Sequence, residues 1–241
     1  MLPDKLIIPN GAELLRVPAG KFIMGSDQNE DREKPQHTVD IPYDYWVGRF
    51  TVTNEQYNQF MKTDYKEGRE NHPVVNVLWR DAQNYANWLN EKFSPQIPQG
   101  FIFRLPSEAE WEKAARGEKG LIYPWGDEFD DTKSNTWESQ KWITTAVGSY
   151  SPQGDSPYGC ADMSGNVWEW THSAWKEYPY NIEDGREDET DLSFTRVIRG
   201  GSFSYVRGFA RCASRLADDP DFAWYLRGFR LVYAPPFNAR M

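Results

Sequence analysis

The chain has little cysteine and little histidine. Its two cysteines, Cys160 and Cys212, are too few for a disulfide scaffold, and no C-x-x-C pair indicates structural zinc or redox exchange. The three histidines, His37, His72 and His172, lie too far apart in sequence to form a helical H-x-x-x-H pair. A facial triad assembled in space is one interpretation, and loop histidines that make ordinary hydrogen bonds are the other. We expect the second.

The sequence lacks the motifs and segments that mark several classes of protein. No apolar run approaches the ~20 residues that span a bilayer, and the N-terminus lacks the basic and apolar segments of a signal peptide. We therefore expect a cytoplasmic protein with no membrane partner. There is no P-loop, no G-x-G-x-x-G and no G-x-S-x-G. The formal charge of −9 disfavours a nucleic-acid partner.

Aromatic residues, by contrast, are abundant. They make up 15% of the 241 residues, with 11 tryptophans, which is enough apolar surface for a folded core. No internal repeat or low-complexity linker divides the chain, so we predict one domain over residues 1–241. Helix signals lie in the first half: capping boxes begin at Thr53 and Ser107, and residues 82–89 have helical periodicity.

The second half reads as short strands between long loops. The runs 196–199 and 228–233 have β-type composition, and polar stretches that contain Gly and Trp separate them. This pattern predicts an α+β domain with little regular secondary structure. The acidic run 183–191 lacks the ligand spacing of an EF-hand, so we predict a solvated loop there rather than a metal site.

The segment 159–170 is dense in oxygen donors. Carboxylates at Asp162 and Glu169, with glycine and backbone carbonyls between them, suit a hard cation such as Ca²⁺. A Gly turn that leads into a buried, Trp-rich strand explains the same residues without a metal.

Seven arginines lie between residues 196 and 230. They indicate either an anion site or buried guanidinium groups bonded to carbonyls and carboxylates, and we favour the second.

Eight ordered motifs resemble those of the formylglycine-generating enzyme (sulfatase-modifying factor) family. They cover about residues 14–233 and read VPAGKFIMG at 17–25, FTVTNEQY at 50–57, HPVVNVLW at 72–79, RLPSEAEWE at 104–112, PWG at 124–126, MSGNVWEW at 163–170, RGGS at 199–202 and GFR at 228–230. The resemblance implies the compact α+β fold of that family, which is related to the C-type lectin fold.

The resemblance also implies metal ligands. In the family, a calcium ion binds the turn that matches this one, and its ligands fall at Asp162, Gly165, Val167 (through the backbone) and Glu169. A second family calcium begins at the position of Asn135 and Thr136, in a loop that is shorter in this chain.

The family's catalysis depends on copper(I) held by two cysteines just after the Gly-Gly-Ser motif. Ser204 stands at the first of these positions, and no cysteine follows before Cys212, which matches a structural cysteine. A hydroxyl cannot replace a thiolate for Cu(I). We therefore expect no formylglycine-generating reaction and neither copper nor iron, with Cys212 as a free buried thiol.

Receptor-like variable proteins of the same fold use the loops between Gly-Gly-Ser and Gly-Phe-Arg as a binding face. The residues that match those loops combine aromatic rings with Arg and Asp, which are good contact residues, although about half of them are expected to pack into the domain. They are Ser202, Ser204, Tyr205, Arg207, Phe209, Asp218, Asp219, Phe222, Trp224 and Tyr225.

Two functions follow. The first is a non-catalytic, calcium-stabilised module that binds a protein or peptide through the loops from Ser202 to Leu226, and a separate signalling, protease or kinase subunit is a plausible associate. The alternative is a metal-dependent oxidoreductase, which uses copper or iron, related to formylglycine-generating enzyme or the sulfoxide synthases. We favour the first because position 204 lacks the thiol.

Overall fold

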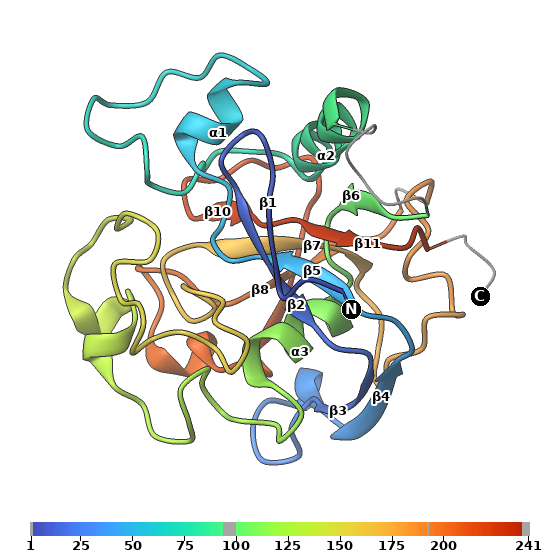
Figure 1. Cartoon of the computed structure of the whole chain (residues 1–241). Helices are drawn as coiled ribbons and strands as arrows, with labels where there is room; N and C mark the ends of the chain where they lie inside the picture. Colours follow the sequence, from blue (N-terminus) through green and yellow to red (C-terminus); the bar gives the residue numbers. More distant parts are fainter. Residues whose placement is uncertain (1, 94–99, 192, 238–241) are drawn as a thin grey trace.

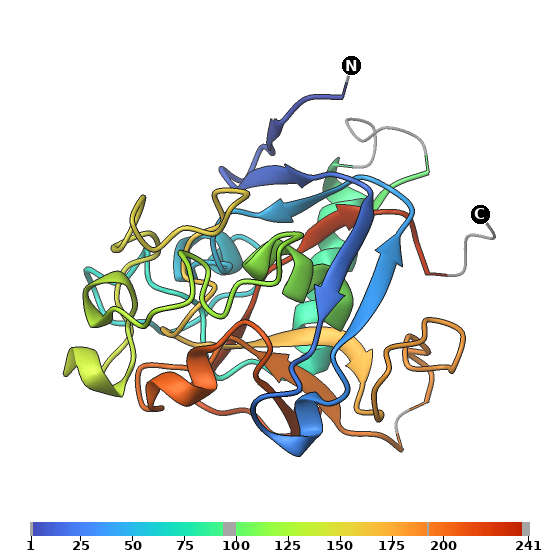
Figure 2. The same cartoon turned by 90° about the horizontal axis from the view of Figure 1, so that it is seen from below.

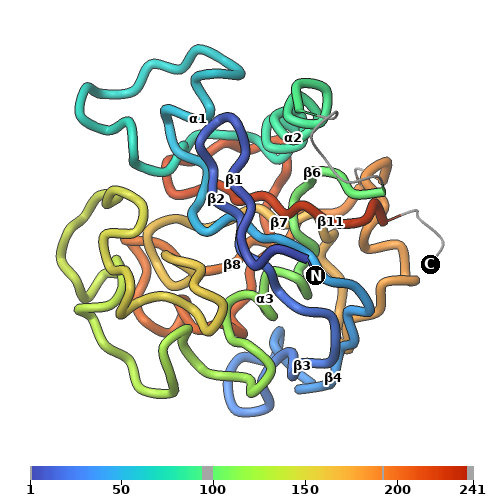
Figure 3. Tube along the Cα trace, in the orientation of Figure 1, coloured from blue at the N-terminus to red at the C-terminus, as the bar shows by residue number. Residues whose placement is uncertain are grey.

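Figure 1 shows the computed structural model, which describes residues 2–93, 100–191 and 193–237. Its largest sheet is antiparallel and joins the two ends of the chain. The strands, in spatial order, are β1 (Lys5–Ile7), β2 (Glu13–Val17), β5 (Tyr45–Gly48), β11 (Val232–Ala234) and β6 (Ile102–Arg104). In Figure 3 the blue N-terminal strands and the red strand β11 lie in the middle of the molecule, and β5 joins them in the sheet.

A second sheet carries most of the conspicuous motifs. Its order is β10 (Arg227–Phe229), β7 (Trp168–Ala174), β8 (Arg196–Arg199) and β9 (Arg215–Asp218), with β10 and β7 parallel and the other pairs antiparallel. The hairpin of β3 (Gly20–Met24) and β4 (His37–Ile41) forms a third, two-stranded sheet.

The predicted helices form, and the predicted caps begin two of them. Thr53 caps α1 (Asn54–Asn58) and Ser107 caps α3 (Glu108–Arg116), each through a reciprocal capping box. The periodic segment becomes α2 (Trp79–Phe93), which packs against β6. α3 contacts β3, β7 and β8, so it bridges the hairpin and the second sheet.

The run 228–233, predicted as one β segment, forms two strands in two different sheets. Gly228 and Phe229 are the last two residues of β10, and Val232 is the first residue of β11. Between them the Arg230 side chain turns inward and is fully buried against Glu169. The Arg230 side chain pairs with Glu169 on β7, and at this residue the chain leaves the second sheet and enters the first. This inward ion pair accounts for the interruption between β10 and β11.

The rest of the chain is irregular, as predicted. Figures 1 and 2 both show the long loops of residues 120–165 gathered on one side of the molecule. Four tryptophans, Trp79, Trp111, Trp168 and Trp170, are among the largest fully buried side chains. Over the described residues, no helix is long and apolar enough to cross a membrane.

Candidate functional site

The turn of residues 159–167 leads directly into β7, whose seven residues are all buried. Gly165 has a φ of +85°, and a Cβ there would lie 2.4 Å from the carbonyl oxygen of Asn135. The two residues form an isolated parallel bridge. Glycine is therefore required at this position, because any side chain would push apart two segments that the bridge holds together.

Asp162 is a buried carboxylate with few partners on this turn. Its Oδ2 accepts a hydrogen bond of 2.7 Å from the backbone N–H of Gly148. Burial raises the pKa of Asp162 to about 6. A carboxylate held in this way gains from a nearby cation, so Asp162 fits the calcium ligand that the resemblance implies.

Glu169 has a different environment. Its two carboxylate oxygens accept hydrogen bonds of 2.6 and 2.7 Å from Arg230, and Oε2 also accepts one of 2.8 Å from the indole Nε1–H of Trp111. Glu169 is therefore the counter-ion of a buried arginine. Of the two predicted carboxylate ligands, Glu169 is in an ion pair and Asp162 is not. A calcium ion at this turn would therefore bind the Asp162 carboxylate. No group of three or more His, Cys, Asp or Glu side chains among the described residues is arranged to hold a metal.

At the second predicted calcium position, hydrogen bonds within the protein hold the loop that contains Asn135 and Thr136. The Asn135 amide donates to the carbonyl oxygen of Ile143 at 2.8 Å and to Oδ1 of Asn166 at 3.2 Å. Thr136 is fully buried, and its Oγ1 has no hydrogen-bond partner within the described part of the chain. Asn135 and Thr136 thus lie beside the first turn, joined to it through Asn166 and the bridge to Gly165.

The arginines behave as the buried-guanidinium interpretation predicts. Arg199 donates to Glu108 and Glu112, and Arg215 donates to Glu108, all within the fully buried interior. Arg196 donates to the backbone carbonyl oxygens of His172, Asp188 and Asp191. These buried arginines are therefore structural, whereas Arg207 is exposed.

Both thiols are buried and free. Burial raises the pKa of Cys212 to about 12 and that of Cys160 to about 11, so both stay protonated near neutral pH. Ser204 is half-buried, and its backbone N–H donates to Oγ of Ser202 at 3.4 Å. The sequence holds no third cysteine. The copper-binding cysteine pair of the family is therefore absent, and the expected free, buried state of Cys212 is confirmed.

The loops from Ser202 to Leu226 divide by exposure. Ser202 and Leu226 are buried, so the Ser202 side chain is not available for contact and drops out of the predicted face. The half-buried members are Ser204, Tyr205, Phe209, Asp218 and Trp224, and the exposed ones are Arg207, Asp219, Phe222 and Tyr225. Phe222 is 56% exposed and Tyr225 is 50% exposed, which is unusual for large aromatic side chains.

Buried anchors hold these loops in place. Tyr205 packs edge-on against Trp168, the first residue of β7, with ring centroids 5.4 Å apart. Arg227 at the start of β10 pairs with Asp218, and its guanidinium lies 5.3 Å from the ring of Phe222. The exposed rings therefore sit on a pre-organised support, which lowers the entropy cost of binding.

A neighbouring loop adds aromatic residues that the sequence analysis missed. The backbone N–H of Trp137 donates to the carbonyl oxygen of Tyr205 at 3.0 Å, and that of Arg207 donates to Glu138 at 2.9 Å. Trp137 and Trp142 are each 50% exposed, with ring centroids 4.2 Å apart. In Figure 1 this yellow-green loop lies beside the orange turn that holds residues 207–210. We call loops 137–143 and 203–226 together the aromatic face.

Two predictions about polar residues need correction. His37 and His172 are not in loops: His37 begins β4, and His172 lies in β7, where its Nδ1 is 2.9 Å from Oε2 of Glu187. The acidic run 183–191 is not wholly solvated, because Arg186 and Glu187 are buried. β7 pairs with β8, which makes His172 part of a sheet. The acidic run folds back over β7, where Glu187 contacts His172 and Ser173.

Comparison with known proteins gives the family. The sulfatase-modifying factor enzyme 1-like domain family matches residues 4–235. Serine/threonine-protein kinase Pkn1 of Chlamydia trachomatis serovar L2 is 33% identical over 90% of this chain, and the match spans 38% of the kinase. Formylglycine-generating enzyme of Thermomonospora curvata is 30% identical over 92% of this chain and 93% of that enzyme.

A bovine protein named inactive C-alpha-formylglycine-generating enzyme 2 is 33% identical over 66% of this chain and 49% of its own length. The structure of PvdO from Pseudomonas aeruginosa superimposes with a TM-score of 0.77 at 25% identity, covering 97% of this chain and 99% of PvdO. The chain therefore belongs to the sulfatase-modifying factor enzyme 1-like domain family, the family of the formylglycine-generating enzymes.

Proposed function

We propose that this chain is a non-catalytic binding module, which recognises a protein or peptide partner through the aromatic face. The observation that carries the proposal is the pair of exposed rings, Phe222 and Tyr225, beside the exposed pair Trp137 and Trp142. Aromatic side chains on a rigid support are the commonest binding hot spots, because they bury a large area at a small entropy cost.

The absence of the copper ligands supports binding over catalysis. The family's oxidation needs two thiolates, and this chain has a hydroxyl at Ser204 and buried, protonated thiols at Cys160 and Cys212. The bovine relative named as inactive supports the use of this domain without the family's chemistry.

The kinase relatives suggest the class of partner. In Pkn1 the matching region makes up 38% of a longer protein, so in those relatives the domain shares a chain with other sequence. We infer that the present chain associates with a separate signalling or kinase subunit. The aromatic face would supply the contact.

Calcium is the second part of the proposal. Asp162 and the backbone carbonyls of Gly165 and Val167 would hold the ion, with Glu169 at its edge where it also pairs with Arg230. Bound there, the ion would neutralise the buried Asp162 and stiffen the turn from which β7 leaves to support Tyr205. Its contribution is to stability, not to chemistry.

A peptide-display selection on the purified protein tests the binding function. Selected peptides are then measured against Trp137→Ala, Tyr225→Ala and the matched control Ile7→Ala, whose side chain is 68% exposed on β1. We expect binding to the control and a loss of about tenfold or more with each face variant, in the range of a hot-spot residue. Peptides that bind all three variants equally would show that the aromatic face is not the binding site.

A further inference from the structure

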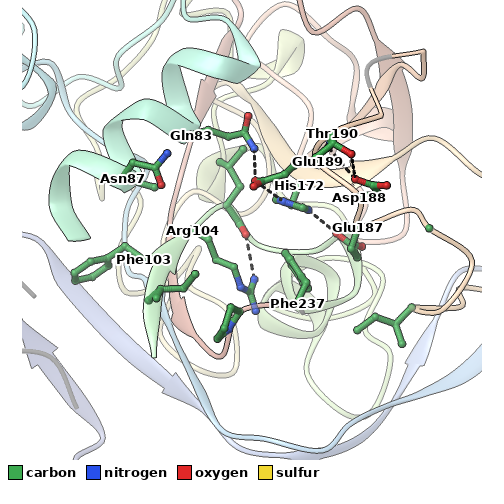
Figure 4. A pocket seen from close by; sticks show the side chains of 16 residues that line it. Gln83, Asn87, Phe103, Arg104, His172, Glu187, Asp188, Glu189, Thr190 and Phe237 are labelled. Atoms are coloured by element: carbon green, nitrogen blue, oxygen red, sulfur yellow. Dashed lines mark hydrogen bonds and ion pairs between the residues drawn. The ribbon is translucent and has the colours of Figure 1, made fainter. Parts of the chain in front are cut away.

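A cavity of about 470 Å³ lies away from the aromatic face. Its walls come from α2, from β6, from His172 on β7 and from the segment of residues 182–190, and Phe237 lies at its side (Figure 4). None of its lining residues belongs to the aromatic face. It is thus a separate candidate site, and its charges decide what it would accept.

The two cationic side chains of the cavity are already neutralised. Arg104 donates to both oxygens of Glu110 at 2.7 and 2.8 Å. His172 is 4% exposed and lies against Glu187, whose other oxygen accepts hydrogen bonds from Ser173 and Tyr180. Neither cation therefore has its charge available for an anionic ligand.

The ring of Phe237 further shields these cations. Its centroid lies 3.8 Å from Cζ of Arg104 and 4.4 Å from the ring centroid of His172. In Figure 4 Phe237 lies beside both side chains. An incoming ligand would meet the aromatic ring before either positive group.

The negative side chains are placed differently. Glu189 is 62% exposed at the cavity mouth, where its Oε2 accepts a hydrogen bond of 3.0 Å from Gln83 and lies 3.5 Å from Nε2 of His172. Asp188 is exposed beside it and accepts hydrogen bonds from Thr190 at one oxygen, Oδ1. Arg196 donates to the backbone carbonyl oxygens of Asp188 and Asp191 and adds a buried positive charge behind this segment. Arg104 is paired with Glu110 and His172 with Glu187, so the exposed charges of the lining are the carboxylates of Asp188 and Glu189. The mouth of the cavity is therefore negative.

The wall formed by β6 and residue 182 is apolar. Ile102 and Ile182 line it, whereas the ring of Phe103 packs on Tyr233 in the core. An apolar wall next to a negatively charged rim suits a ligand with an alkyl chain and a terminal positive charge.

We propose that this cavity binds the ammonium group of an aliphatic amine, with Glu189 and Asp188 as its counter-charges and Ile102 and Ile182 beside its alkyl chain. The cavity volume exceeds that of a single lysine side chain, so a lysine of a peptide and a small free diamine share the chemistry that the site recognises. Glu189 exchanges its contact with His172 for a contact with the ligand.

Isothermal titration calorimetry on the full chain tests the proposal. The probes are 1,5-diaminopentane and Nα-acetyl-lysine amide, and the control is Nα-acetyl-norleucine amide, which keeps the alkyl chain and lacks the charge. We expect at least one charged probe to bind and the norleucine compound to bind about tenfold more weakly or not at all, as expected for loss of a charged hydrogen bond. The charged probe that binds more tightly distinguishes a free amine from a lysine side chain.

The matched variants are Glu189→Gln and Glu183→Gln. Both remove one exposed carboxylate from the same segment, but only Glu189 lines the cavity. We expect Glu189→Gln to weaken amine binding about tenfold with an unchanged melting temperature, and Glu183→Gln to leave binding unaltered. Equal binding of the charged and uncharged probes, equal binding by the two variants, or no binding of either amine would overturn the proposal.

Discussion

Glu169 and Arg230 form a fully buried bidentate ion pair, with N–O distances of 2.6 and 2.7 Å. The same guanidinium donates to the carbonyl oxygens of Gly48 at the end of β5 and of Ala161 in the turn before β7. One arginine thus ties both large sheets to the candidate calcium turn. Glu169, which the sequence suggested as a metal ligand, also holds the fold together.

Removing the Glu169 carboxylate should therefore destabilise the protein whether or not calcium is present. We expect Glu169→Ala to lower the free energy of unfolding by about 3–5 kcal/mol, because it leaves a buried guanidinium without its counter-ion. Urea unfolding in chelator measures this value. The control is Glu13→Ala, whose partners Lys5 and Arg49 are partly exposed and whose loss should cost less than about 1 kcal/mol. Equal losses in the two variants would refute the role of the pair.

Asp162 should give the metal-free protein a distinctive pH dependence. Burial raises its pKa to about 6 in the folded state, against about 3.9 in an unfolded chain. The folded state therefore keeps its proton to higher pH, so the stability from this group is full below about pH 4 and is lost as pH rises to about 6, a change of about 3 kcal/mol. Chelator-treated Asp162→Asn should lack this loss in unfolding curves measured across that range.

Calcium should reverse that penalty, because it binds the ionised carboxylate. We expect added calcium to raise the melting temperature of the wild-type protein more at about pH 7 than at about pH 5. Asp162→Ala should abolish the rise. Identical wild-type melting curves in calcium and in chelator at about pH 7 would remove calcium from the proposed function.

The exposed aromatic residues should serve binding and contribute little to stability. We expect Phe222→Ala, Tyr225→Ala and Trp142→Ala to change the free energy of unfolding by no more than about 0.5 kcal/mol. Tyr205→Ala, in contrast, should destabilise the protein because its ring packs on buried Trp168. Chemical denaturation of the four variants checks this division. A large loss of stability at Phe222 or Tyr225 would show that these rings belong to the core.

The thiols should be inert in the native state. Cys160 and Cys212 are buried and their pKa values are raised to about 11 and about 12. We expect Ellman's reagent to label neither cysteine at neutral pH and both after denaturation. Rapid labelling of the native protein would show an accessible thiol and would reopen the oxidoreductase alternative.

Local signals in the sequence predicted the local structure well. The capping boxes at Thr53 and Ser107 begin helices as expected, because a cap satisfies backbone groups within its own turn. The buried arginines were also predictable in kind, since an acidic chain with clustered arginine can pair these charges internally. Their partners, such as Glu108 for Arg215, lie far away in sequence and could not be read from it.

Features that depend on distant contacts were missed. The split of 228–233 arises from the pairing of Arg230 with Glu169, which no periodicity reveals. Glu187 is buried against His172, Ser173 and Tyr180, although Asp188 and Glu189, which follow it, are exposed. Trp137 and Trp142 belong to the aromatic face through the hydrogen bond from Trp137 to Tyr205, which links two segments far apart in the sequence. Two tryptophans in a short polar loop were the one available signal.

Site-specific photo-crosslinking tests the central claim most directly. A photoreactive phenylalanine analogue replaces Tyr225 on the aromatic face in one sample and Ile7 on β1 in another, in cells that make the chain. We expect a discrete protein or peptide adduct at position 225 and none at position 7. Equal adducts at both positions, or none at position 225, would contradict a binding function of this face.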